Sequence, residues 1–294
     1  MTHNRRELLR AALAAIERQS HPPDRVLVVD NASSDGTPEM VRGEYGEVEL
    51  LALTSNEGGA GGFHEGMKEA YRRGAEWLWL MDDDTIPRAN ALAELMAAAD
   101  RAAHLGPRLL ASKALWTDGQ LHPLNVPGIE RERLARIVSG AELRLLPITT
   151  ATFASLLVSR SAVARHGLPA KHFFVWSDDI DYTSRVLRDD PGFLVPTSIV
   201  EHRTESAYAH VCAPPERFYF HVRNTLYLLR DRLDRPREAA YLGWELVSSI
   251  TRYLRASSEP TRAMRSILRG LRHGLRRLPP DSARYPFREG AEHG

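Results

Sequence analysis

Three consecutive carboxylates, Asp82, Asp83 and Asp84, directly follow the apolar run 77–81. Ligand sites of open α/β sheets lie at the carboxyl ends of strands, so this acidic turn stands where a site is expected. Adjacent carboxylates repel one another unless a cation neutralises them, and a bound Mg²⁺ or Mn²⁺ keeps positions free for substrate phosphates. The alternative is a solvated acidic turn, but the place after a strand favours a metal site.

A second acidic cluster, Asp178, Asp179 and Asp181, follows the aromatic segment 173–176. Aromatic neighbours can desolvate a carboxylate and raise its pKa, which suits a general base. The alternative is an acidic first helical turn that complements the helix dipole, with Ser177 as the cap. Both interpretations can hold together.

Two further features are weaker signals. His202 follows the strand-like run 193–200, and a single histidine is more often structural than a metal ligand. If it converges with residues 82–84, its imidazole can complete a carboxylate-rich shell, which Mn²⁺ tolerates better than Mg²⁺. The segment 56–62 reads as a flexible, glycine-rich loop that can admit a diphosphate or sugar, although it is not GxGxxG.

Alternating elements must position these side chains. Strand-like runs at 25–30, 48–53 and 77–81 are separated by helical patterns, which continue to a helix at 88–103. This βαβ spacing predicts an α/β fold with a mainly parallel sheet flanked by helices. Such sheets normally begin with a strand, yet the chain enters a helix at about residue 5, so the first strand is expected to be missing.

The remaining chain divides into a less regular part and a helical part. Residues 107–150 show no clear period, and order returns at 155–159 and 173–176. A helix is expected at 178–188, a strand at 193–200 and long helices from 216 to about 277. We therefore predict a catalytic domain over 1–210 and a helical C-terminal region over 211–294.

Composition excludes several classes of protein. Thirty-nine basic and 38 acidic residues among 294 give a formal net charge of +1, so the whole molecule is not a polyanion binder. With 43% hydrophobic residues the chain is neither disordered nor fibrous. Cys212 is the single cysteine, and no apolar run approaches the roughly 20 residues of a membrane span. A cytoplasmic protein is expected.

Five ordered segments resemble family 2 glycosyltransferases of the GT-A fold. They are THNR (2–5), VLVVDNASSDGT (26–37), NEGGAGGF (56–63), WLWLMDDD (77–84) and FFVWSDDIDYTSR (173–185). Within that family the chain looks most like bacterial galactofuranosyl- and rhamnosyltransferases of cell-wall polysaccharide synthesis. The glycine-rich segment, the triple aspartate and HVRNTLYLLR (221–230) favour the galactofuranosyl members.

The resemblance implies a role for each candidate side chain. The residues expected to bind the nucleotide-sugar are Thr2, Arg5, Asp30, Asn56, Gly59, Gly61, Gly62, Asp82 and Asp83. The metal ligands would be Asp82, Asp84 and His202. Asp179 would be the catalytic base and Asp178 would bind the acceptor hydroxyl. Trp176 and Asp181 would lie on the acceptor side.

The implied reaction is an inverting transfer that depends on Mn²⁺ or Mg²⁺. Galactofuranose would move from UDP-galactofuranose to a hydroxyl of a cell-wall or lipid-linked glycan. A rhamnosyltransferase that uses dTDP-rhamnose would share nearly all these residues. A third possibility is a catalytically inert nucleotide-sugar-binding module or partner subunit, which the missing first strand makes plausible.

The C-terminal segment 261–280 contains six arginines and no acidic residue. Apolar residues recur between the arginines at helical spacing: Met264, Ile267, Leu268, Leu271, Leu275 and Leu278. A basic amphipathic helix can lie on an anionic leaflet, which predicts peripheral contact with the inner face of the cell membrane. The alternative is that the stripe packs on the catalytic domain. Nucleic-acid binding is not expected, because no recognition module accompanies the charge.

Overall fold

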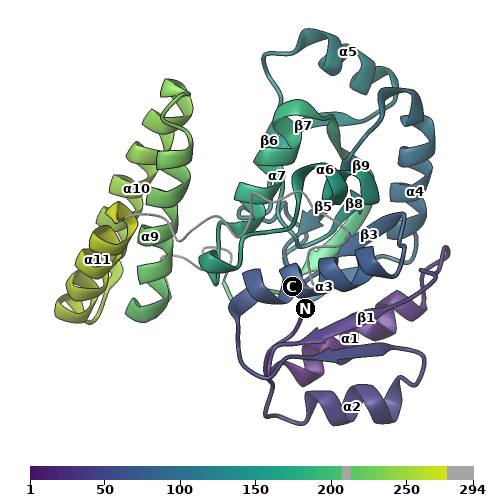
Figure 1. Cartoon of the computed structure of the whole chain (residues 1–294), viewed down its shortest axis with the longest axis horizontal. Helices are drawn as coiled ribbons and strands as arrows, with labels where there is room; N and C mark the ends of the chain where they lie inside the picture. The colour runs from purple at the N-terminus through teal and green to yellow at the C-terminus, as the bar shows by residue number, and fades with distance from the viewer. Residues whose placement is uncertain (207–212, 277–294) are drawn as a thin grey trace, which may run out of the picture.

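The computed structural model describes residues 1–206 and 213–276. Figure 1 shows an α/β part that carries both acidic clusters and a separate bundle of three helices beside it. Cys212, the predicted domain boundary at 210 and residues 277–294 lie outside the described residues. The boundary therefore stays a prediction, although the first helix of the bundle begins at Pro215, close to it.

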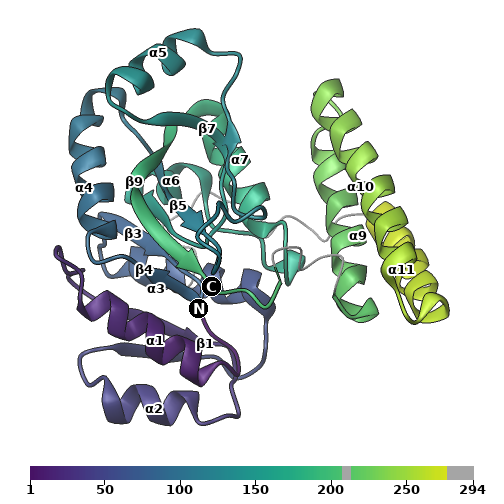
Figure 2. The same cartoon turned by 180° about the vertical axis from the view of Figure 1, so that it is seen from behind.

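The first half of the chain alternates helices and strands, as its sequence predicts. Its elements are α1 (Arg6–Glu17), β1 (Leu27–Asp30), α2 (Thr37–Glu44), β2 (Glu49–Ala52), α3 (Gly58–Arg72) and β3 (Trp77–Leu80). The apolar stripe of α1 packs on β1 and α2, with Leu9, Leu13 and Val28 buried together. Figure 2 shows α1 and α2 close to this strand pair. Strands β1 and β2 pair in parallel and form a small sheet of their own.

A larger sheet of seven strands occupies the rest of the α/β part, in the order β3-β8-β5-β9-β7-β6, with β4 paired to β9. Its further strands are β4 (Thr85–Pro87), β5 (Leu109–Leu115), β6 (Gly128–Ile129), β7 (Leu146–Thr150), β8 (Leu156–Ser159) and β9 (Gly192–His202). Three of them, β5 to β7, fall in the segment 107–150 that showed no clear period.

The α/β class is confirmed, but the expectation of a mainly parallel sheet is wrong, because the sheet is mixed. In the described chain, β5 and β9 form the parallel pair of the large sheet, while β3–β8, β5–β8, β4–β9, β7–β9 and β6–β7 are antiparallel. The βαβ alternation that predicts parallel pairing stops after β3. Beyond β3, several consecutive strands are joined without a crossover helix, which permits antiparallel neighbours.

Residues 1–2 lie between the two sheets, ahead of α1, and form no strand there. The backbone nitrogen of Thr2 donates to Val29 O at 3.0 Å, and Thr2 O accepts from Asn31 N at 2.9 Å. On the other side, the nitrogen of Met1 donates to Met81 O at 3.0 Å. Thr2 thus forms a single parallel bridge with Asp30 rather than a strand. This bridge brings the end of β1 next to the end of β3.

Helices cover both faces of the large sheet. Those not yet given are α4 (Ala91–Arg101), the 3₁₀ turn η1 (Ala103–Leu105), α5 (Leu134–Glu142), α6 (Arg160–His166), the 3₁₀ turn η2 (Lys171–Phe173) and α7 (Asp178–Asp189). One core cluster joins α3 and α7 through Met67 and Tyr182, both fully buried. A second packs α4 on the sheet through Leu95 and Phe193.

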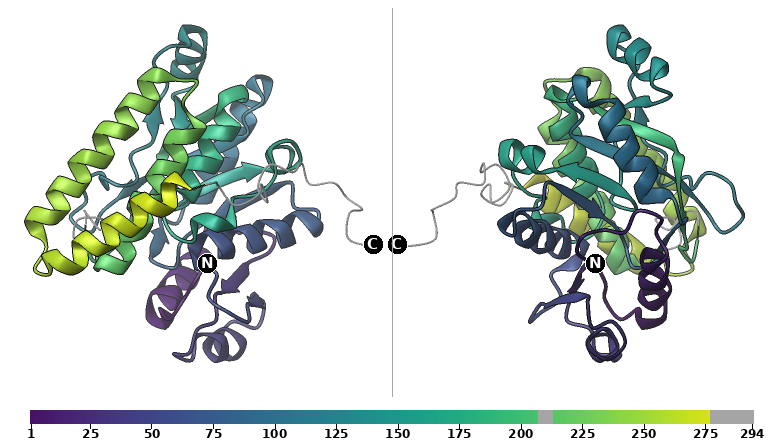
Figure 3. Two further views of the ribbon diagram at one scale, coloured as in Figure 1. Left: turned by 60° about the vertical axis from the view of Figure 1, so that its left-hand side comes forward. Right: turned by 90° about the vertical axis from the view of Figure 1, so that its right-hand side faces the viewer.

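The C-terminal helices are α9 (Pro215–Asp231), α10 (Pro236–Ala256) and α11 (Pro260–Leu275), as the sequence predicts. They pack on one another around Phe218, whose ring stacks on Tyr253 with centroids 3.7 Å apart. Figure 3 shows the bundle along one flank of the α/β part. Within residues 1–206 and 213–276, no helix is long and apolar enough to cross a membrane.

Candidate active site

The acidic turn after β3 meets the end of β9. Strand β4 begins at Thr85 and pairs antiparallel with β9, so that Thr85 lies opposite His202. This register carries the imidazole to the turn, where His202 Nε2 lies 2.9 Å from Asp84 Oδ1. One potential ligand atom each from Asp82, Asp84 and His202 lies within 4.8 Å of the others. The two features that the sequence left separate therefore converge.

A residue that sequence reasoning missed orients His202. The Nδ1 atom of His202 lies 2.7 Å from Asn125 Oδ1, while Asn125 Nδ2 donates to Thr152 Oγ1 at 2.7 Å. Because the amide oxygen is an acceptor, Nδ1 carries the proton, and Nε2 faces the carboxylates. Asn125 comes from the irregular segment 107–150, where no local pattern marked it.

Burial and neighbouring charges shift the pKa values of Asp82 and Asp84 in opposite directions. Burial, then the charge of Asp84, raises the pKa of Asp82 to about 6. Although burial opposes it, hydrogen bonding to His202 and the charge of Arg5 lower the pKa of Asp84 to about 2. Arg5 Nη1 donates to Asp84 Oδ2 at 2.5 Å and contacts Asp83 Oδ1 at 3.4 Å. Two carboxylates and one imidazole form a donor set that fits Mn²⁺, so these residues can hold a divalent metal.

A buried acceptor stands at the end of β1. Asp30 is 1% exposed, and its Oδ2 accepts a hydrogen bond from Ser33 N at 3.1 Å. Its Oδ1 is buried without a hydrogen-bond partner among the described residues. An orphaned carboxylate oxygen is costly unless a ligand donates to it. Asp30 is therefore prepared to accept a hydrogen bond from a bound molecule.

The glycine-rich segment is not the flexible loop that the sequence suggested. Residues 58–62 form the first turns of α3. A Cβ on Gly62 would lie 2.4 Å from Met1 Cγ, and one on Gly58 would lie 2.0 Å from Phe174 O. Close packing against two other segments thus overrides the low helix propensity of glycine. Gly61 and Gly62 are buried, whereas Gly59 is partly exposed.

Asn31, a second residue that the sequence analysis passed over, fixes the start of that helix. It is 1% exposed, and its Oδ1 accepts from Glu57 N at 2.8 Å. Its Nδ2 donates to Gly58 O at 2.8 Å and to Asn56 Oδ1 at 3.1 Å. Asn31 directly follows Asp30, so its place after a strand end is a signal that could have found it. It ties the exposed Asn56 and the glycine segment to the β1 end.

The second acidic cluster opens α7 beside the first. Asp178 is 6% exposed and Asp179 is partly exposed. Burial, and then the charge of Asp179, raises the pKa of Asp178 well above its usual range. Burial, with a smaller contribution from Asp82, raises the pKa of Asp179 to about 7. Because the charge of Asp82 acts on both side chains, the two acidic clusters lie within electrostatic range of each other.

The two acceptor-side candidates lie farther along α7 and on the loop before it. Asp181 Oδ2 lies 3.6 Å from Arg185 Nη2, one helical turn on. Trp176 packs against α9, with its ring 4.9 Å from Arg217 Cζ. Ser177 is the N-cap of α7, but its side chain makes no capping hydrogen bond, contrary to the expectation. The structure thus packs Trp176 against α9 and gives Asp181 a basic partner, and their place on the acceptor side stays a prediction.

Arg217 is a cation that sequence reasoning did not single out. It lies on the first turn of α9, and partial burial followed by the charge of Arg5 holds its pKa below its usual range. The charges of Glu205 and Asp84 also act on it, so Arg217 lies within electrostatic range of the acidic turn. Arg217 is one of 36 arginines, and no motif in the sequence distinguishes it from the others.

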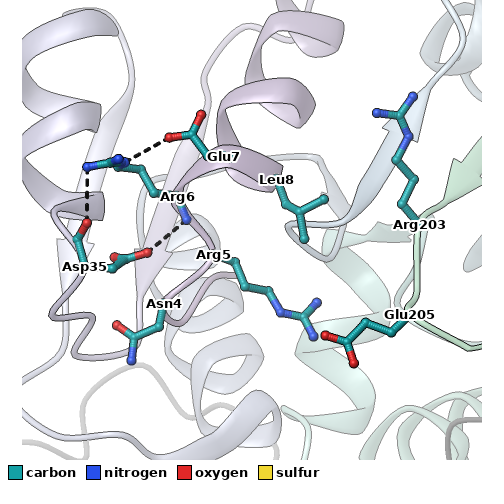
Figure 4. Close-up of a pocket in the computed structure, with 8 residues that line it drawn as sticks. All are labelled: Asn4, Arg5, Arg6, Glu7, Leu8, Asp35, Arg203 and Glu205. Carbon is teal, nitrogen blue, oxygen red and sulfur yellow. Dashed lines mark hydrogen bonds and ion pairs between the residues drawn. The ribbon is translucent and has the colours of Figure 1, made fainter.

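A pocket of about 450 Å³ opens beside Arg5 (Figure 4). Its lining is mostly charged and consists of Asn4, Arg5, Arg6, Glu7, Leu8, Asp35, Arg203 and Glu205. Arg5 links this pocket to the acidic turn through its contacts with Asp83 and Asp84. The pocket therefore adjoins the convergent site but does not contain its carboxylates.

A family model for glycosyl transferase family 2 matches residues 1–163, more than half of the chain. The chain belongs to glycosyl transferase family 2. Galactofuranosyltransferase GlfT1 of Mycobacterium tuberculosis is 30% identical over 219 residues, which cover 74% of this chain and 70% of the relative. The enzyme of the same name from Mycolicibacterium smegmatis is 29% identical over 278 residues, 85% of this chain and 88% of the relative. The protein is thus a glycosyltransferase related to galactofuranosyltransferases.

Solved structures confirm the GT-A fold. TarS 1–349 of S. aureus in complex with UDP has a TM-score of 0.56 and 16% identity, covering 88% of this chain and 71% of that one. This chain spans 43% of a longer TarS structure. The mannosyltransferase PcManGT of Pyrobaculum calidifontis, with GDP-Man and Mn²⁺, has a TM-score of 0.53 and 18% identity, covering 90% and 76%.

Proposed function

We propose that this glycosyltransferase moves galactofuranose from UDP-galactofuranose to a hydroxyl of a cell-wall or lipid-linked glycan, with inversion and with the help of Mn²⁺ or Mg²⁺. The convergence of Asp82, Asp84 and His202 with the acidic start of α7 carries the proposal. The choice of sugar rests on the similarity to the mycobacterial GlfT1 proteins.

Asp179 is the base in this proposal. Burial raises its pKa to about 7, so that near neutral pH it is both substantially ionised and basic enough to accept a proton. The acceptor O–H bond breaks as its proton passes to the carboxylate of Asp179. The oxygen then forms a bond to the anomeric carbon as the bond from that carbon to the diphosphate breaks. One base suffices, and attack from the face opposite the leaving group inverts the configuration.

The donor would lie across the sheet ends. The unpaired Oδ1 of Asp30 would accept a hydrogen bond from uracil N3–H, and Thr2, Asn56 and the glycine turns of α3 would line the nucleotide-sugar. Arg5 and Arg217 bring positive charge toward the diphosphate. When bound by Asp82, Asp84 and His202, a divalent ion would neutralise charge that develops on the departing diphosphate.

Two measurements test the donor and the metal. We expect UDP with Mn²⁺ to raise the melting temperature more than dTDP with Mn²⁺, because specific ligands stabilise the folded state by mass action. We expect UDP release from UDP-galactofuranose, in the presence of glycan acceptor, to stop with EDTA and in Asp84→Asn. The exposed Asp100 of α4 provides a matched control, Asp100→Asn. Preference for dTDP and turnover of dTDP-rhamnose would establish the rhamnosyltransferase instead.

We further propose that the bundle rests on an anionic membrane surface, where a lipid-linked acceptor would be found. The apolar stripe predicted for α11 divides: Ile267 and Leu271 pack inside the bundle, while Met264, Leu268 and Leu275 are exposed. Helix α10 adds exposed Tyr241, Trp244 and Val247. Helix α11 itself contains no acidic residue, and although its Arg262 pairs with Glu216 and Glu259, its other arginines complement anionic lipid.

Vesicle binding tests this surface with the full chain. We expect co-sedimentation with phosphatidylglycerol vesicles, weaker binding to phosphatidylcholine, and a loss in Trp244→Ser combined with Leu268→Ser. Leu134→Ser is the matched control, because Leu134 is 71% exposed and belongs to α5 rather than to the bundle. Equal binding by the double variant and the wild type would remove the proposal.

A further inference from the structure

The loop that leads into α7 has an unusual backbone. Phe174, Trp176 and Ser177 have φ values of 65°, 63° and 72°. Bulky residues rarely adopt this left-handed region, and they stay in it only where the surroundings hold them. The next two residues are Asp178 and Asp179. The conformation of this loop therefore sets the direction in which the proposed base points.

Helix α9 holds the loop through its backbone carbonyls. The Nδ2 atom of Asn224 lies 3.0 Å from Phe173 O, 2.8 Å from Val175 O and 2.9 Å from Trp176 O. Asn224 is fully buried. A carboxamide has two N–H donors, so these donors are shared among three carbonyls of the loop.

Arg223 also holds the loop through its backbone carbonyls. Its Nη2 donates to His172 O at 2.7 Å and to Phe173 O at 2.8 Å. Its Nε donates to Asn224 Oδ1 at 2.9 Å, which fixes the orientation of the amide. The guanidinium lies 4.9 Å from the ring centre of Phe220, so that aromatic contact holds it in place.

Helix α3, which belongs to the proposed nucleotide-sugar site, also holds the loop. Ala60 N, in the first turn of α3, donates to Phe174 O at 3.1 Å, and Gly58 lies against the same carbonyl. The ring of Phe174 stacks on Phe220 of α9, with centroids 5.0 Å apart. The loop is thus fixed between the glycine turns of α3 and the first helix of the bundle.

We propose that Asn224 is a positioning residue, which holds the loop 173–177, with its positive φ values at Phe174, Trp176 and Ser177, in the conformation that aims Asp179 at the acceptor. The C-terminal bundle then contributes to catalysis, because its helix α9 holds the loop that precedes Asp179. The inference rests on the proposed role of Asp179 as base. It adds a function for the Arg–Asn pair in HVRNTLYLLR, which the sequence analysis used only as a point of resemblance.

The first test separates turnover from donor binding. We expect Asn224→Ala to lower kcat about 100-fold, since a misplacement of about 1 Å near the reacting groups has that effect. The Kd for UDP with Mn²⁺ should stay within twofold, because Asn224 contacts none of the proposed donor-binding side chains. Thr225→Val is the matched control: Thr225 is the next residue and is also buried, but its hydroxyl donates to His221 O in the same helix, at 2.8 Å, and not to the loop.

A double-mutant cycle distinguishes positioning from general destabilisation. In an Asp179→Asn background, Asn224→Ala should lower the residual kcat by less than threefold, because the base that it positions is already gone. Assays are run below the melting temperature of each variant, and Asn224→Ser, which keeps one donor, replaces Asn224→Ala if that variant does not fold.

The outcomes separate the two proposals. A wild-type kcat in Asn224→Ala or Asn224→Ser overturns the inference while leaving the base in place. A full 100-fold loss in both backgrounds also overturns it. High turnover in Asp179→Asn alone would instead refute the proposed base.

Discussion

Replacement of Asp179 by asparagine tests the proposed chemistry most directly. The substitution keeps the size of the side chain and removes only its ability to take a proton. General bases contribute typically about 10²–10⁴-fold to turnover. We therefore expect kcat to fall within that range in Asp179→Asn. UDP affinity should be unchanged or slightly higher, because a negative charge near Asp82 is lost.

The pH dependence follows from the same carboxylate. Burial, aided by Asp82, raises the pKa of Asp179 to about 7. The base works only when ionised, so turnover should be present above this pKa and fall as the pH drops through it. One unit below, at about pH 6, roughly a tenth of the carboxylates are ionised, which predicts about a tenfold loss of kcat. The slope should be absent from Asp179→Asn.

Release of UDP from the sugar donor between pH 5.5 and 8.5, at saturating donor and Mn²⁺, provides the assay. Asp100→Asn serves as the control for a surface carboxylate. Turnover in Asp179→Asn within tenfold of the wild type would place the base elsewhere. A wild-type profile that stays flat from pH 6 to 8 would contradict the burial argument.

Three other substitutions probe the supporting residues. Asp30→Asn should weaken UDP binding about 5- to 150-fold in calorimetry, since a buried acceptor is lost (~1–3 kcal/mol); equal affinity would place the base of the nucleotide elsewhere. Asn125→Leu should weaken Mn²⁺ binding about 10- to 100-fold, as it frees the imidazole of its partner; an unchanged Mn²⁺ titration would count against this. Gly58→Ala should lower the melting temperature, because the new Cβ meets Phe174 O at φ +72°, whereas Gly46→Ala, with nothing within 4 Å, should not.

Much of the fold could be predicted because its signals are local. The β-branched run before Asp30 and the apolar run before Asp82 each mark a strand end, and both strands form. The helices after residue 215 follow from long periodic patterns. The mixed pairing of the large sheet was not predictable in this way, because strand order depends on contacts between segments far apart in the chain.

The site shows the same division between local and distant information. Clusters of acidic residues after an apolar run can be recognised in the sequence, so Asp84 and Asp179 are candidates from the sequence alone. Their supports are not: Asn125 meets His202 from 77 residues away, and Asn224 meets Trp176 from 48. The prediction of a loop at the glycine-rich residues 58–62 was wrong because it rested on composition alone, whereas close packing against Met1 and Phe174 favours the helix.

The charges of the site argue that donor and metal depend on each other. The carboxylates of Asp82, Asp84 and Asp179 share one electrostatic environment, in which burial and then the charge of Asp84 raise the pKa of Asp82 although His202 opposes the rise. A diphosphate would add negative charge to this space and would be repelled. A divalent ion between carboxylates and diphosphate reverses the sign of that interaction, so each would bind better in the presence of the other. Burial, with a smaller contribution from Asp82, keeps Asp179 basic enough to take a proton near neutral pH, so one buried acidic site would serve both donor binding and acceptor activation.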